Sequence, residues 1–143
     1  MTEWTTEQSS ESTTIEIRVP AQLEQLVMLR ALAETVALIA DFGLDEVTDI
    51  RLALDEIATE LILGAVADTT IDCRFTYRES AMLVQVSSVA VADVVPGQDS
   101  FGWHIVRTLT DTVNAAQAPL DTASGGYPTV VDFRWVRGGS DGR

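Results

Sequence analysis

The stretch Ile50-Arg-Leu-Ala-Leu-Asp-Glu-Ile-Ala-Thr-Glu-Leu-Ile62 decides the fold of this chain. Its apolar residues recur at three- and four-residue spacing, which predicts a helix from about Glu46 to Ala65 with one buried stripe. Asp49, Glu56 and Glu60 fall roughly 100° from that stripe, on its flank. Two carboxylates four residues apart, Glu56 and Glu60, therefore share one side of the helix.

The residues before this helix predict a strand and a first helix. Ile15–Val19 alternates apolar and polar residues, which indicates a strand with one buried face. From Ala21 to about Phe42 the apolar residues follow helical spacing, and Gly43 is the expected stop. Asp45 is the expected N-terminal cap of the next helix. The predicted buried stripe of the first helix consists of Leu26, Leu29, Ala33, Val36 and Ala40.

The residues after the central helix predict a hairpin, a third helix and two more strands. Residues 71–77 and 82–86 alternate around a turn at Glu79, which is typical of an antiparallel pair. Ser100 is expected to cap a helix whose apolar face is Phe101, Ile105 and Leu109. A short strand near residue 113 and an alternating strand over residues 131–136 complete the chain.

This order of elements predicts an α+β fold. The one-sided alternation of the strands favours a mixed, mostly antiparallel sheet with one covered face, so we expect a two-layer sandwich with three helices on that face. A length of 143 residues fits one domain. We expect a disordered acidic and polar tail over residues 1–14, the folded domain over 15–137 and a flexible tail over 138–143.

The charge of the chain limits its partners. Twenty-two acids face nine bases, all of them arginine, for a formal net charge of −13. Such a chain repels nucleic acid and anionic membranes and attracts basic proteins, although the charge also fits a role in solubility alone. Cys73, the one cysteine, stands in an apolar alternation and is expected to be a buried thiol. With no secretory signal visible, a cytoplasmic protein is expected.

The residues together resemble the RsbW-type anti-sigma factors, also called switch-protein serine kinases, of the histidine-kinase-like (GHKL) ATPase superfamily. The resemblance covers residues 15–136 and is strongest at Arg51-Leu-Ala-Leu-Asp-Glu-Ile-Ala-Thr. Further matches are Leu29-Arg30, Phe101-Gly-Trp-His-Ile-Val106 followed by Asp111, and Gly125-Gly126. The helix start at Ser100 is similar to that of the actinobacterial branch.

The resemblance assigns roles to four residues of a nucleotide pocket. It implies that Glu56 is the general base, and that Glu60, which replaces the family's Asn, would be the Mg²⁺ ligand if ATP binds. Ser88 stands where the family has the Asp that binds adenine, in a segment, Ser88–Ala92, without the family's glycines. Gly102 is what remains of the phosphate loop. We therefore expect a degenerate pocket, with no cofactor required and ATP with Mg²⁺ as the alternative.

The resemblance also implies partners. It predicts a homodimer that sequesters an alternative sigma factor and is released by an anti-anti-sigma factor, with Glu24 and Arg30 of the first helix at the partner surface. An exposed helix face without a partner explains these two residues equally well. The alternative functions are an active ATP-dependent serine kinase, and a regulatory module of the same fold that binds another basic protein.

Overall fold

The computed structural model describes residues 12–79, 81–96 and 100–136. The predicted tails lie outside these ranges, except that the first strand begins at Thr13, within the predicted N-terminal tail. The elements in chain order are β1 (Thr13–Pro20), the short 3-10 helix η1 (Leu23–Gln25), α2 (Leu26–Ile39), α3 (Leu44–Leu63), β2 (Thr70–Arg78), β3 (Ala81–Ala90), α4 (Phe101–Leu109), β4 (Thr112–Gln117) and β5 (Tyr127–Val136).

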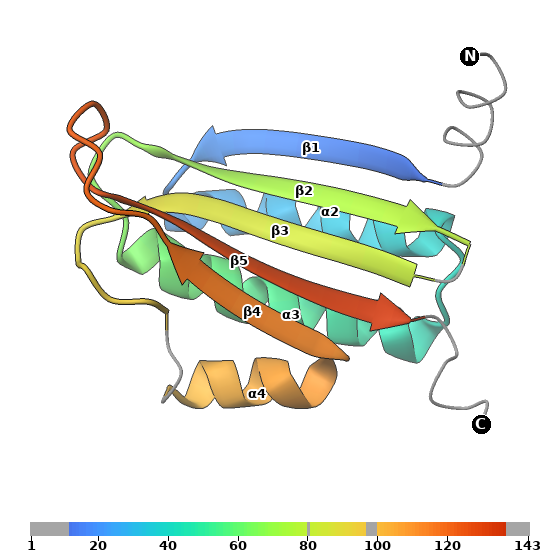
Figure 1. The fold of residues 1–143 in the computed structure, drawn as a ribbon. Coiled ribbons are helices and arrows are strands. Elements are labelled where there is room, and N and C mark those ends of the chain that lie inside the picture. The colour runs from blue at the N-terminus through green and yellow to red at the C-terminus, as the bar shows by residue number, and fades with distance from the viewer. Residues whose placement is uncertain (1–11, 80, 97–99, 137–143) are drawn as a thin grey trace, which may run out of the picture.

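The predicted two-layer α+β architecture is confirmed. Five strands form one sheet in the order β1-β2-β3-β5-β4, and α2, α3 and α4 lie side by side on one of its faces (Figure 1). Every strand pair of the described residues is antiparallel, in line with the predicted mixed, mostly antiparallel sheet but without a parallel pair. A hairpin joins β2 to β3, the longer loop of residues 118–126 joins β4 to β5, and the α4 segment leads from β3 to the edge strand β4.

The core lies between the sheet and the helices. The five predicted stripe residues of the first helix are all buried, from Leu26 to Ala40. The alternating strand residues meet them from the sheet, with Phe75 and Phe133 fully buried. Cys73 is also buried, and burial raises the pKa of its thiol to about 12 with a smaller contribution from Asp72, as expected for a structural cysteine.

The corner between α2 and α3 differs from the prediction. The left-handed residue that ends α2 is Asp41, with a φ of 69°, while Gly43 has an ordinary φ and is the N-cap of α3. The Gly43 N–H donates to Glu46 Oε1 at 3.0 Å, so Glu46 satisfies the helix start that Asp45 was predicted to cap. Asp tolerates the left-handed region through local hydrogen bonding, which is why glycine is not required at Asp41.

The buried face of α4 was also wrongly predicted. Phe101 is 79% exposed, whereas Trp103 and Val106 are buried and Leu109 packs against the core. The Ser100 hydroxyl accepts the Trp103 N–H at 3.0 Å, so the predicted cap is confirmed. In a nine-residue helix with apolar residues on two sides, periodicity alone does not determine which side is buried.

Candidate functional site

The C-terminal ends of α3 and β3 meet at one end of the sandwich. Val91 N–H donates to Gly64 O and Val66 N–H donates to Val89 O, both at 2.9 Å. A bridge between Ala65 and Ala90 lies between these two hydrogen bonds. The helix carrying Glu56 and Glu60 and the strand carrying Ser88 are therefore fixed against each other by backbone contacts.

Glu56 and Gly102 come from different helices and lie in contact. A Cβ atom built on Gly102 would lie 2.5 Å from Glu56 Oε1. The Glu56 carboxylate thus lies against the first turn of α4, where the unpaired backbone N–H groups of a helix favour negative charge. This position is the one at which a helix N-terminus would otherwise attract the phosphate of a ligand.

Ser88 is part of the sheet and not of a loop. The strand β3 continues to Ala90, with Ser88 opposite Thr129 and Ala90 opposite Tyr127 on β5, so the first three residues of Ser88–Ala92, the segment that the resemblance matches to the family's adenine-binding residues, belong to a strand. The Ser88 side chain is buried, and its Oγ has no hydrogen-bond partner. An unpaired buried hydroxyl costs about 1–3 kcal/mol, so the Ser88 Oγ favours contact with a polar ligand atom.

Gln117 closes the same end of the molecule, a role that the sequence did not indicate. Its Nε2 donates to Ala92 O at 3.1 Å, to Val94 O at 3.3 Å and to Thr129 Oγ1 at 3.0 Å. One side chain of β4 therefore holds the start of the β3–α4 connection against β5. A polar residue at the end of a short edge strand carries no pattern from which these contacts are predictable.

Glu60 lies one turn beyond Glu56 on α3 and is half-buried, as Glu56 is. Within the described ranges, no three His, Cys, Asp or Glu side chains gather in a way that would hold a metal ion. The two carboxylates alone would leave most of the six positions around Mg²⁺ to water and phosphate oxygens.

The two predicted partner residues differ in their surroundings. Glu24 is exposed in η1, at the start of the first helical segment. The Arg30 guanidinium lies across the α2–α3 seam, where its Nε donates to Asp55 Oδ1 at 2.9 Å. A second ion pair crosses the same seam, where Arg51 Nε lies 3.0 Å from Glu34 Oε2. The Nε–H of Arg51 forms no hydrogen bond with this carboxylate. Both arginines of the helix pair therefore join α2 to α3.

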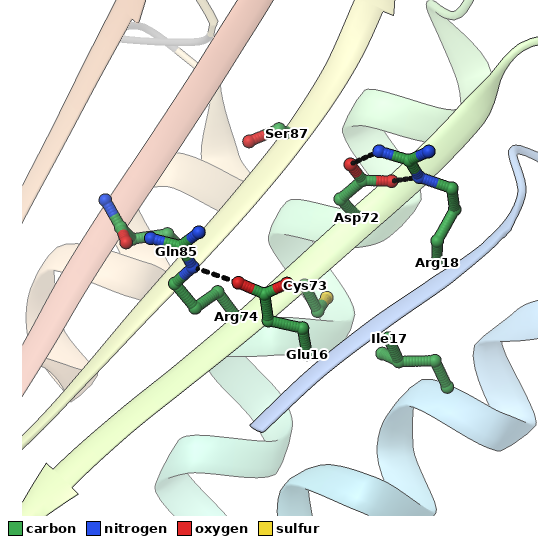
Figure 2. Close-up of a pocket in the computed structure, with 8 residues that line it drawn as sticks. All are labelled: Glu16, Ile17, Arg18, Asp72, Cys73, Arg74, Gln85 and Ser87. Carbon is green, nitrogen blue, oxygen red and sulfur yellow. Dashed lines mark hydrogen bonds and ion pairs between the residues drawn. The ribbon is translucent and has the colours of Figure 1, made fainter. Parts of the chain in front are cut away.

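The uncovered face of the sheet carries a polar hollow of about 540 Å³ (Figure 2). Arg18 forms two parallel hydrogen bonds with Asp72, at 2.9 and 3.0 Å, and Arg74 pairs with Glu16 at 2.7 Å. The four charges cancel in pairs, and the side chains are largely exposed to water. This hollow lies on the sheet face opposite α3 and α4, the two helices that carry Glu56 and Gly102.

The fold defines a class of protein: an antiparallel five-stranded sheet with three helices on one face, consistent with the histidine-kinase-like ATPases. The chain is similar to two proteins named anti-sigma-F factor RsbW, from Mycobacterium tuberculosis strains CDC 1551 / Oshkosh and ATCC 25618 / H37Rv, at 35% identity over 99 residues in each case. No family model matches the chain.

The matched segment is 69% of this chain and 59% of each relative, so the chain spans less than two thirds of their length. This similarity and this fold support the resemblance to the RsbW-type anti-sigma factors and their actinobacterial branch. Among the described residues, none of the helices combines the length and the apolar character of a membrane-spanning segment.

Proposed function

We propose that this chain is an anti-sigma factor that sequesters an alternative sigma factor by protein–protein contact, and that it does so without a nucleotide. The similarity to two anti-sigma-F factors supports the first part. The net charge of −13 suits a basic partner, because opposite charge speeds encounter and favours the correct orientation. An anti-anti-sigma factor would compete for the same surface and release the sigma factor.

The second part depends on the Glu56 carboxylate at the start of α4. A triphosphate placed there would bring its charge close to Glu56, and two like charges at about 4 Å repel by about 4 kcal/mol at an effective dielectric near 20. The chain contains no lysine to offset this repulsion, and Arg30 and Arg51 are engaged at the other side of α3. Ser88 offers only a neutral hydroxyl at the position where the family has the Asp that binds adenine. These residues do not fit Mg-ATP.

A homodimer is part of the proposal. Leu23, Val27 and Met28 are between 48% and 68% exposed on η1 and the first turn of α2, and a group of exposed apolar side chains is typical of a protein interaction surface. Glu24 lies among them, and Arg30 follows on the same helix. A second copy would cover the apolar residues, and the sigma factor would then contact the acidic rim at Glu24.

A capture experiment tests the sigma-factor assignment. The immobilised full chain is exposed to a lysate of its source, and retained proteins are identified by mass spectrometry, with apyrase and EDTA present to remove nucleotide and metal. We expect a sigma factor to be retained by the native chain and lost with Glu24→Arg, while the matched charge reversal Glu79→Arg, in the β2–β3 turn, retains it. Retention that requires added Mg-ATP, or that survives Glu24→Arg unchanged, contradicts the proposal.

The ATP-dependent serine kinase is the second candidate, and one observation favours it. Glu56 lies beside Gly102, so no side chain of that residue would stand between the carboxylate and a phosphate bound at the start of α4. A kinase that used Glu56 as its base would transfer labelled phosphate from ATP to a serine of its partner. That transfer would disappear in Glu56→Gln, whereas no transfer by the native chain removes this candidate.

A further inference from the structure

The strand β4 forms one of the two open edges of the sheet. In the order β1-β2-β3-β5-β4, only β1 and β4 have a single neighbour, and Figure 1 shows β4 at the side of the sheet where α4 lies. An edge strand presents unpaired N–H and C=O groups, which proteins usually protect with charged side chains, proline or a covering segment. The edge strand β1 has Glu16, Arg18 and Pro20, whereas the sequence of β4, Thr-Val-Asn-Ala-Ala-Gln, contains no charge and no proline.

The register with β5 determines which backbone groups face the open edge. The Ala118 N–H donates to Pro128 O at 2.8 Å, and from there hydrogen-bonded and non-hydrogen-bonded pairs alternate along the two strands. Every second residue from Ala118 back to Thr112 therefore bonds to β5, and the N–H and C=O groups of Val113 and Ala115 point away from it. None of the backbone hydrogen bonds between separate segments of the described residues reaches Val113 or Ala115. These groups remain for a further strand.

A hollow of about 490 Å³ lies at the start of this edge. It is lined by Arg107 of α4, by Thr110 and Asp111, and by the first three residues of β4. The Asp111 carboxylate is already engaged, because its Oδ2 accepts the Val136 N–H at 2.7 Å. Arg107 is exposed, and none of the ion pairs of the described residues includes it. The hollow therefore combines an unpaired cation with the unpaired backbone groups of the edge.

We propose that the free edge of β4 binds an extended segment of a partner protein. The segment would add a strand antiparallel to β4, bonded to the backbone of Val113 and Ala115, and would place an Asp or Glu side chain on Arg107. In such contacts the main chain supplies affinity, and a side-chain pocket supplies specificity. The β4 strand of a second copy contains no carboxylate for Arg107, so it fits the hollow less well. The proposal is independent of the sigma factor and of the surface at Glu24.

A synthetic peptide tests the edge directly. The probe has about eight residues of alternating valine and threonine, with one glutamate near its C-terminal end, and both of its ends are blocked so that this side chain supplies the only carboxylate. Titrated into the full chain labelled with ¹⁵N, it is expected to shift amide resonances of residues 107–117 and to slow the hydrogen exchange of Val113 and Ala115. The same peptide N-methylated at successive residues is expected to leave them unchanged. Shifts concentrated on residues 13–20 or 23–63, or equal binding of both peptides, overturn the proposal.

Matched variants test the carboxylate contact. Arg107→Gln is expected to weaken binding about three- to tenfold, because a charge-assisted hydrogen bond at an exposed site is lost. Arg78→Gln removes an exposed arginine at the end of β2 and is expected to bind as the native chain does. A peptide with glutamine in place of glutamate should lose the same factor against the native chain and nothing more against Arg107→Gln. Equal weakening by the two arginine variants, or additive effects of the peptide and chain substitutions, contradict the contact.

A proline variant tests the backbone contact. The Ala115 N–H points away from β5, so Ala115→Pro removes no hydrogen bond of the sheet, and edge strands tolerate proline in this orientation. Binding is expected to weaken at least about tenfold, with an unchanged circular dichroism spectrum. The N-methylated peptide probes the same contact on the native chain, so the proposal does not depend on the folding of this variant. Sedimentation tests the other occupant: a change of oligomeric state in Ala115→Pro would assign the edge to a second copy and contradict the proposal.

Discussion

The Glu56 carboxylate and Gly102 depend on each other at the start of α4. A Cβ on Gly102 would come within 2.5 Å of Glu56 Oε1, although the end of a flexible side chain is able to move away. Gly102→Ala is therefore expected to stabilise a Glu56→Ala background by about 0.5–1 kcal/mol, the usual gain of Ala over Gly in a helix. In the native background the gain should be smaller, since the carboxylate must move. Urea unfolding of the four variants of this double-mutant cycle measures the difference, and additive effects would contradict the contact.

Asp49 is the residue whose ionisation opposes folding. Its pKa is raised in the folded chain, so the ionised carboxylate destabilises the fold above that pKa, and the effect vanishes below the ordinary value of 3.8, where Asp49 is protonated in both states. Asp49→Asn should raise the free energy of unfolding at pH 7 by about 0.2–0.5 kcal/mol, and the gain should disappear as the pH falls below 3.8. Glu79→Gln is the control without a gain. A loss of stability in Asp49→Asn at pH 7 would show that the carboxylate has a partner that favours folding.

At the scale of elements, the loop between β4 and β5 closes onto the ends of β3 and α3. Gly126 makes this possible, because a Cβ there would lie 2.5 Å from Ala90 O and 2.6 Å from Val66 Cγ2. Gly126→Ala is expected to destabilise the fold by about 1–3 kcal/mol, since backbone must move to admit the methyl group. Gly64→Ala is the matched control, with 3.7 Å to the nearest atom and an expected change within about 0.5 kcal/mol. Equal midpoints of urea unfolding for the two variants would contradict the close approach at Gly126.

The elements also show what the sequence determines. A long helix with one apolar stripe, such as α2 or α3, was predictable, because only one face of it is able to reach the core. The buried face of α4 was not, because nine residues with Phe101, Trp103 and Ile105 offer two apolar sides, and only the packed structure shows that Trp103 and Val106 are the buried ones. The hydrogen bonds of Gln117 and the ion pair of Arg30 with Asp55 join residues that are distant in sequence. No local sequence pattern therefore predicts them.

At the scale of the molecule, charge separates between the two faces. The uncovered face of the sheet carries arginines and acids in near balance, with two ion pairs at the hollow of Figure 2. Residues 23–63, which hold α2 and α3, contain nine acids, and the two arginines of this segment form ion pairs across the seam between the two helices. The side of the molecule formed by α2 and α3 is therefore the acidic side. This arrangement favours basic proteins and disfavours phosphates at the same surface.

Calorimetric titration of the full chain with Mg-ATP tests this account most directly. With Glu56 against the start of α4 and no lysine in the chain, we expect no binding tighter than about 100 μM, which corresponds to about −5.5 kcal/mol. Glu56→Gln should bind Mg-ATP more tightly than the native chain, because it removes the repelling charge and keeps the shape. Micromolar binding by the native chain that Glu56→Gln weakens would contradict the account and make Glu56 part of a working nucleotide site.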